Sequence, residues 1–252
     1  MRFFLALLVA TSLATSLTAD SATEIFDKGE TLDYSLTWLK VTGGMARMTV
    51  SPKDEERYRI TSVARSSGSL ARFIKVRDEI ETTVSRANFG TQLYVKRLDE
   101  KGDKHEETTV ISEGVAARTK NGKTKTVKVP EPVFDPISVI YYFRTLELAP
   151  GNAYDMTLIS DGKMYTVNAR VLRREVVTTP AGKFNTLLVE PKMINSGVPR
   201  EERLFIWYTD DERRLPVRIR TEIKVGAITA SLRASAPGAS SPEPPPLAEP
   251  VK

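Results

Sequence analysis

Hydrophobic side chains recur at every second position along most of this chain, and this period restricts the fold more than any other feature. In the segments TLDYSLTWL and LPVRIRTEIKV, apolar residues alternate with polar or charged ones. Four side chains of the first segment share one face: Leu32, Tyr34, Leu36 and Trp38. A period of two is that of a strand with one dry and one wet face, which is typical of antiparallel sheets. The sequence therefore predicts an all-β domain.

Turn-forming residues separate these runs at short intervals. Asn121-Gly122 and Asp161-Gly162 accept the positive φ angles of a two-residue hairpin turn. Similar signals occur at Gly43-Gly44, Pro180-Ala181-Gly182 and Asp210-Asp211-Glu212. About a dozen strands joined in this way predict one strongly curved antiparallel sheet or a half-open barrel.

One segment, Asp135–Leu146 (DPISVIYYFRTL), breaks the period and carries the signals of a helix. Asp135 suits the N-cap and Pro136 the first helical position. Only three of its side chains are expected to face water: Ser138, Arg144 and Thr145. A helix that is apolar on most sides must be buried, so we expect it to plug the concave side of the sheet. A second short helix is predicted within Ser67–Val76.

The two ends of the chain differ in composition from the domain between them. Residues 1–19 hold one basic residue, an apolar run and a small-residue cleavage site at Ala19, as in a secretory signal peptide. Residues 235–252 are rich in Pro, Ser and Ala and are predicted to be a disordered tail. Residues 20–234 then form one domain. We expect a periplasmic or otherwise exported protein, with no second apolar run long enough to span a membrane. The absence of cysteine argues against a lipoprotein anchor.

Few groups in the sequence indicate catalysis. The single histidine, His105, lies in a charged turn, and no G-x-S-x-G motif is present. The carboxylates gather in turns, where a solvated role explains them. We therefore predict no catalytic residue, no metal site and no cofactor. A hydrolase with an unrecognised carboxylate pair ranks third among the functions considered.

The segment Ala117–Pro130 (ARTKNGKTKTVKVP) is basic and contains no acidic residue. Its five cations are Arg118, Lys120, Lys123, Lys125 and Lys128. Such a patch would attract anionic head groups or acidic glycans. A solvated edge hairpin that resists aggregation explains the same lysines. The net charge of +5, from 37 basic and 32 acidic residues, is modest, and aromatic residues for base stacking are missing here, so no nucleic acid partner is expected.

Five segments resemble a known family in the same order along the chain. They are KGETLDYSLTWLKVTGGMARMTV, FIKVRDEIETTV, DPISVIYYFRTL, TPAGKFNTLLVEP and WYTDDERRLPVRIRTEIKVGAITASL. The chain resembles the bacterial envelope family of domains of unknown function numbered 3108, over essentially the whole mature domain. The resemblance implies a secreted all-β domain and carries no established activity. By looser architectural analogy, the pattern is similar to periplasmic lipoprotein carriers, whose half-open barrel is plugged by helices and holds acyl chains.

These observations favour a non-catalytic protein that binds a hydrophobic or amphipathic envelope molecule in the hollow of the sheet. Burying an acyl chain yields about 0.8 kcal/mol per methylene without any catalytic group. The residues expected near such a ligand are Trp38, Ile137, Ile140, Tyr141, Phe143 and Trp207, although ordinary core packing is their alternative role. The alternative function is a structural or protein-interaction module of an envelope complex, with the same fold fully packed and a protein as its partner.

Overall fold

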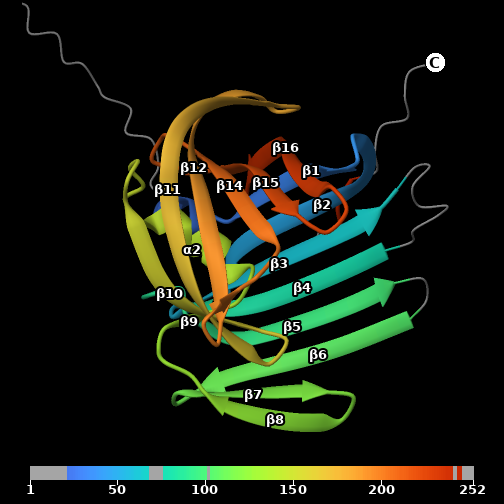
Figure 1. Cartoon of the computed structure of the whole chain (residues 1–252), viewed down its shortest axis with the longest axis vertical. Helices are drawn as coiled ribbons and strands as arrows, with labels where there is room; N and C mark the ends of the chain where they lie inside the picture. The colour runs from blue at the N-terminus through green and yellow to red at the C-terminus, as the bar shows by residue number, and fades with distance from the viewer. Residues whose placement is uncertain (1–21, 68–75, 101–102, 241–242, 246–252) are drawn as a thin grey trace, which may run out of the picture.

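The computed structural model describes residues 22–67, 76–100, 103–240 and 243–245. Its described residues contain one sheet of sixteen strands (Figure 1). The strands are β1 (Glu30–Trp38), β2 (Val41–Pro52), β3 (Arg57–Ser66), β4 (Val76–Ser85), β5 (Thr91–Glu100), β6 (Asp103–Ser112), β7 (Val115–Lys120), β8 (Lys123–Lys128), β9 (Val133–Phe134), β10 (Ala153–Ser160), β11 (Lys163–Thr179), β12 (Gly182–Asn195), β13 (Val198–Pro199), β14 (Arg203–Thr209), β15 (Pro216–Glu222) and β16 (Ala227–Pro237). The predicted signal peptide and nearly all of the helix predicted within Ser67–Val76 lie outside the described residues.

The strands follow the order β8-β7-β6-β5-β4-β3-β2-β1-β16-β15-β14-β12-β11-β10-β9, and β13 pairs with β12 off this path. All neighbours are antiparallel except β9 and β10, which are parallel. The two edges, β8 and β9, do not pair, so the sheet curls without closing. In Figure 1 the long β11–β12 hairpin arches over the strands beside it. This confirms the predicted single, strongly curved antiparallel sheet, with more strands than predicted.

The first and last strands of the domain pair at the centre of the sheet. Glu30 of β1 lies opposite Pro237 of β16, and the ladder continues to Trp38 opposite Ile228. The prediction that the tail begins at Ser235 was therefore wrong at its start, because β16 continues through Pro237. Small side chains there pair as well as larger ones, since a ladder is held by backbone hydrogen bonds.

Two turns confirm the hairpin signals and one corrects them. Asn121-Gly122 (φ 52° and 71°) joins β7 to β8, and Asp161-Gly162 (φ 51° and 73°) joins β10 to β11. Gly43-Gly44 is not a turn, because both residues lie within β2. There Leu36 pairs with Gly44 and Thr37 with Thr42, so Gly43 is the extra residue of a bulge. The β1–β2 turn is formed by Leu39-Lys40 instead.

Two short helical segments fill the concave side. Helix α1 spans Ala22–Lys28, and α2 spans Ser138–Tyr142 and continues as the 3₁₀ turn η2 (Phe143–Thr145). The helix predicted over Asp135–Leu146 is thus present but shorter. Strands from both halves of the sheet contact it: the Tyr208 hydroxyl of β14 donates to the Ile140 carbonyl at 3.0 Å, and Thr82 of β4 contacts the Asp135 that precedes it. This confirms that the helix plugs the sheet.

The plug and the sheet share one hydrophobic core. Phe26 of α1, Tyr141 of α2 and Phe143 of η2 are fully buried within it, together with Tyr34 and Tyr208 of the sheet. Because protein interiors pack as densely as organic crystals, these side chains occupy the volume inside the curl.

Ser138 and Arg144 were predicted to face water, and this was wrong, because both are fully buried. Thr145 is exposed as predicted. Ser138 bonds Thr91 and Arg144 bonds Glu30, two partners on the sheet that the helix pattern alone does not reveal.

Candidate functional site

Asp135 holds the entry to α2 and is itself fully buried. Its Oδ1 accepts from the backbone N–H groups of Ile137 (2.7 Å) and Ser138 (3.0 Å). Its Oδ2 accepts from the hydroxyls of Thr82 (2.6 Å) and Thr91 (2.7 Å), on β4 and β5. The helix begins at Ser138 with Ile137 at its N-cap, so the predicted N-cap at Asp135 lies two residues too early. The Asp135 carboxylate nevertheless binds the N–H groups at the start of the helix and fastens it to the sheet.

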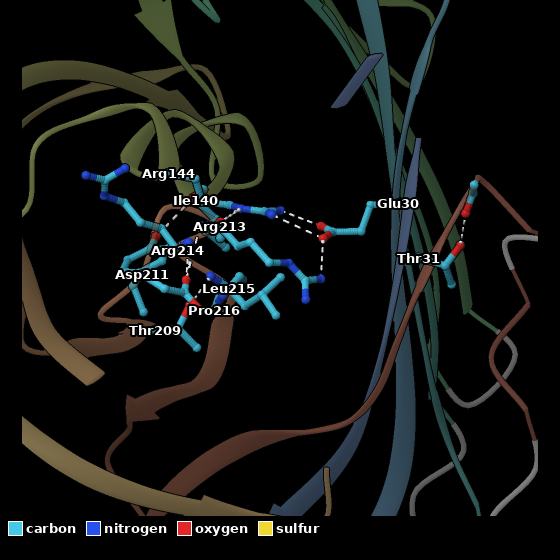
Figure 2. Close-up of polar contacts among 12 residues, drawn as sticks. Glu30, Thr31, Ile140, Arg144, Thr209, Asp211, Arg213, Arg214, Leu215 and Pro216 are labelled. Atoms are coloured by element: carbon cyan, nitrogen blue, oxygen red, sulfur yellow. Dashed lines mark hydrogen bonds and ion pairs between the residues drawn. The ribbon is translucent and has the colours of Figure 1, made fainter. Parts of the chain in front are cut away.

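A buried ion pair fastens the other end of the plug (Figure 2). Arg144 Nη1 lies 2.5 Å from Glu30 Oε2, and Arg144 Nη2 lies 3.2 Å from Glu30 Oε1. The side chains are 0% and 1% exposed. Arg144 Nε also donates to the Arg213 carbonyl at 3.2 Å. The fork of the guanidinium matches the carboxylate, and each charge compensates the other where water is excluded.

The turn between β14 and β15 completes this cluster (Figure 2). Asp211 Oδ1 accepts from the Thr209 hydroxyl (2.6 Å) and from the N–H groups of Arg213 and Arg214 (both 3.1 Å). This arrangement fixes Arg213, whose guanidinium lies 3.7 Å from Glu30 Oε1 and remains partly exposed. Glu30 therefore faces two cations, one buried and one at the surface.

Aromatic rings surround the buried pair. The Arg144 guanidinium lies over the ring of Phe26 at 4.7 Å and over that of Tyr141 at 5.5 Å. Phe26 in turn makes edge contacts with Tyr58, Phe89 and Tyr141 at centroid separations of 6.0, 5.3 and 5.6 Å. Such contacts stabilise a cation that has lost its water. The interior of the curl is thus a packed aromatic and ionic cluster.

A small cavity borders this cluster at the surface. It has a volume of ≈ 330 Å³ and is lined by Ile25, Lys28, Gly29, Glu30, Arg213, Ala236 and Pro237. A larger open groove of ≈ 670 Å³ lies at the far ends of β3–β6, against the loop at Glu131-Pro132-Val133. Neither is lined by the helix residues predicted to contact a ligand.

The structure brings four of the six predicted ligand residues into one core cluster. Ile140, Tyr141, Phe143 and Trp207 belong to it, and Ile137 is half-buried against it. Trp38 lies elsewhere, at the β1–β2 turn, where its Nε1 donates to the Val225 carbonyl at 3.0 Å. Its distance from the plug follows from its place at the end of β1.

Trp207 belongs to the same buried core cluster, but its side chain leaves β14 on the face opposite the one that meets α2. Its neighbour Tyr208 points to the helix, and successive side chains of a strand point to opposite faces. Trp207 donates through Nε1 to Glu175 of β11 and lies beneath the Arg218 guanidinium at 5.7 Å. Arg218 in turn donates to the Thr178 carbonyl at 2.6 Å. Trp207 therefore packs under the arching β11–β12 hairpin.

The basic segment is the predicted edge hairpin, since β8 ends the sheet. Arg118 is held by Glu107 of β6, with its Nε and Nη2 at 2.5 and 2.6 Å from the two carboxylate oxygens. This pairing with Glu107 raises the pKa of Arg118. Lys123, Lys125 and Lys128 are exposed, and Lys120 is half-buried. The exposed cations of the hairpin are thus lysines alone.

Three core tyrosines are sensitive to alkali. Burial, with smaller contributions from neighbouring charges such as Glu30, raises the pKa of Tyr34 and Tyr141 above the ordinary value, and burial alone raises that of Tyr208. The folded protein therefore requires the neutral phenol, whereas the unfolded chain ionises near pH 10. Their stabilising contribution is present below about pH 10 and is lost as pH rises above that value.

We expect the free energy of unfolding, measured by denaturant titration, to fall as pH is raised above about 10. The part of the tyrosinate absorbance that Tyr208→Phe removes should appear only together with loss of the folded signal. In Tyr208→Phe, which removes one of these phenols, the fall should be shallower. A wild-type stability that stays constant through this range would contradict the assignment.

Glu30 was not predicted as a site residue, and Arg144 was predicted to face water although it is buried. The available signal was that Arg144 is the only charged residue of an otherwise apolar helix. A charge in such a helix requires a partner when it is buried. The identity of the partner was not accessible, because Glu30 lies in another strand.

The fold and site define an all-β protein with a curved, open sheet and a filled hollow. A family model described as protein of unknown function (DUF3108) matches residues 33–233, so the chain belongs to that family. No curated protein matches it. Within the described ranges, no helix has the length and apolar character needed to cross a membrane.

Of three similar solved structures, the first shows the same fold at low sequence identity. A beta-barrel-like protein of domain of unknown function DUF1849 from Brucella abortus has a TM-score of 0.60 and 12% identity, covering 84% of this chain and 99% of that one. The hypothetical protein CT021 from Chlamydia trachomatis has a TM-score of 0.36 and 9% identity, covering 90% and 97%. A putative exported protein with a YmcC-like fold from Bacteroides fragilis has a TM-score of 0.33 and 11% identity, covering 83% and 96%.

Proposed function

We propose that the protein is a non-catalytic interaction module of the cell envelope, in which the hollow of the sheet is a structural core. The observation that supports this is the filling of the hollow by the chain's own side chains. Tyr141, Phe143 and Arg144 are fully buried there, and Arg144 is matched by Glu30. Side chains packed at the density usual for protein interiors would leave no volume for an acyl chain without rearrangement.

The sequence and the surface support the location and the mode of contact. The predicted signal peptide would deliver the mature chain to the periplasm. At one edge of the sheet, β8 presents unpaired backbone groups beside Lys123, Lys125 and Lys128. An exposed edge strand with lysines resists self-association while it remains open to an acidic partner strand.

The test is native mass spectrometry of the protein purified from the periplasm, followed by solvent extraction. We expect the mass of the mature chain alone, with no fluorescence gain when the apolar probe N-phenylnaphthylamine is added. Crosslinking in cells should instead recover a protein partner. A discrete added mass that extracts as lipid would contradict the proposal.

One observation favours a second function, that of a carrier with a displaceable plug. Phe26 sits at the centre of the aromatic cluster, yet it belongs to the seven-residue helix α1 close to the predicted mature N-terminus. Displacement of so short a terminal helix would open a space between Tyr58, Phe89 and Tyr141, which now touch the Phe26 ring.

A truncation distinguishes the two functions in the same assay. If the protein is a carrier, a variant lacking residues 22–28 should remain folded by circular dichroism. It should also show a gain of probe fluorescence that the full chain does not show. The matched control lacks residues 246–252, an equal number from the other end. If the first truncation folds and still binds no probe, the carrier is excluded and the interaction module stands.

A further inference from the structure

Several of the exposed apolar side chains of the described structure gather at the tips of two adjacent hairpins. Leu39 (53% exposed) and Val41 (50%) lie at the β1–β2 turn, and Val225 (61%) and Ile228 (44%) lie at the β15–β16 turn. Trp38 pairs with both Val41 and Ile228, and β1, β2, β15 and β16 lie together in Figure 1. We call these five side chains the apolar tip.

The two turns are packed into one surface. The Trp38 indole donates to the Val225 carbonyl at 3.0 Å and so ties one turn to the other. A Cβ placed on Gly226 would lie 2.7 Å from Leu39 Cδ2, so the Leu39 side chain crosses the second turn at this glycine. Gly226 also has φ +79°, which favours glycine. The apolar tip is therefore an ordered surface.

The β1–β2 turn carries unfavourable residues for its conformation. Leu39 (φ 47°) and Lys40 (φ 67°) are both left-handed, in the pattern of a type I′ turn that Asn-Gly forms most easily. The chain uses Asn121-Gly122 for the same conformation between β7 and β8. A bulky residue at positive φ costs free energy, and such strain concentrates at functional sites. In this turn the strained conformation holds Leu39 and Lys40 at the outermost position of the hairpin.

The two turns of the tip carry lysines and no acidic residue. Lys40 and Lys224 are exposed, and residues 37–42 and 223–228 contain no acidic side chain. Glu201 and Glu202 line a small hollow beside Lys224, and Glu202 is ion-paired with Arg200 at 3.1 Å. Glu222, which precedes the second turn, is ion-paired with Arg220 at 3.2 Å and Arg203 at 3.6 Å. Tryptophan and aliphatic side chains flanked by lysine are the combination that partitions into the headgroup region of anionic bilayers.

We propose that the apolar tip docks the protein on the surface of an anionic phospholipid bilayer. Leu39 and Val225 enter the headgroup region, Lys40 and Lys224 contact lipid phosphates, and Trp38 lies at the level of the interface. The inference goes beyond the proposed function, because it requires the tip alone and holds whether the hollow is filled or opens.

The experiment is cosedimentation of the full mature chain with vesicles of phosphatidylcholine, alone or mixed with phosphatidylglycerol. We expect binding that requires phosphatidylglycerol and weakens with salt, and a blue shift of tryptophan emission on binding. Leu39→Asp combined with Val225→Asp should reduce binding at least about tenfold. Lys40→Ser should reduce it about fivefold. Trp38→Phe should abolish the blue shift, since Trp207 is buried.

The matched control is Val198→Asp, the same type of change at a 68% exposed valine on β13, which should bind like the wild type. Circular dichroism and thermal unfolding would establish that each variant is folded. Absence of binding to both vesicles would overturn the proposal. Equal losses of vesicle binding in Val198→Asp and in the double variant would also overturn the proposal. A dimer in sedimentation velocity that the double variant dissociates, without vesicle binding, would assign the tip to a second copy of the chain instead.

Discussion

Replacing Arg144 by methionine is expected to lower the free energy of unfolding by about 3–5 kcal/mol. The substitution leaves the Glu30 carboxylate buried without the guanidinium that compensates it, and the remaining partner, Arg213, lies 3.7 Å away at the surface. Removal of one member of a buried pair costs more than the pair contributes, because the remaining charge has lost its water. Chemical denaturation monitored by circular dichroism measures this loss.

A double variant tests whether the cost comes from the unpaired charge. Arg144→Met combined with Glu30→Leu should recover most of the lost stability, since well-packed apolar side chains replace buried ion pairs at little net cost. The matched control is Arg59→Met, which breaks the exposed pair between Arg59 and Glu81 on β3 and β4 and should cost less than about 1 kcal/mol. If Arg144→Met costs no more than Arg59→Met, the pair does not hold the plug.

The second large effect is expected from Asp135→Ala, which should destabilise the protein by about 3–5 kcal/mol. The change leaves the hydroxyls of Thr82 and Thr91 and the N–H groups of Ile137 and Ser138 without their shared acceptor. Three of these four residues are fully or almost fully buried, so water does not replace the lost hydrogen bonds. The same denaturation assay measures the effect.

Asp135→Asn is a more conservative test of the same carboxylate. Its amide has one oxygen where the carboxylate has two, so one pair of donors would face an NH₂ group, and most of the loss should persist. The control is Asp155→Ala on β10, an exposed aspartate whose single side-chain partner is Asn168, and it should change stability by less than about 0.5 kcal/mol. Equal losses at Asp135 and Asp155 would show that the carboxylate does not anchor α2.

Local chemistry accounts for the parts of the fold that were predictable. Asn121-Gly122 and Asp161-Gly162 form the expected turns because these residues tolerate positive φ angles. This preference is local and does not depend on the rest of the sheet. Leu39-Lys40 was not predictable as a turn, since neither residue favours that conformation and Gly43-Gly44 nearby carried the stronger signal. The strained turn is imposed by the pairing of β1 with β2 and by the contact with Gly226.

The candidate site was predictable only in outline. Hydrophobicity identified the helix around Ile140 and Tyr141 as a plug, because a helix this apolar must be covered. It did not identify the partner of Arg144, since Glu30 precedes it by 114 positions and the pairing depends on the topology of the whole sheet. It also did not separate Trp38 from the core of the plug. The local sequence around an aromatic residue in a strand does not indicate which side chains it will contact in the folded protein.

The central pairing of β1 with β16 has a consequence for biogenesis. Glu30 meets Pro237 only when nearly the entire domain has been synthesised. Contacts between segments so far apart in sequence form slowly, because the chain loses loop-closure entropy before the stabilising contacts are made. Until then β1 and β15 are unpaired edges, which other chains can join. A chain that ends before β16 is therefore expected to keep these two edges open, where other chains can pair with them.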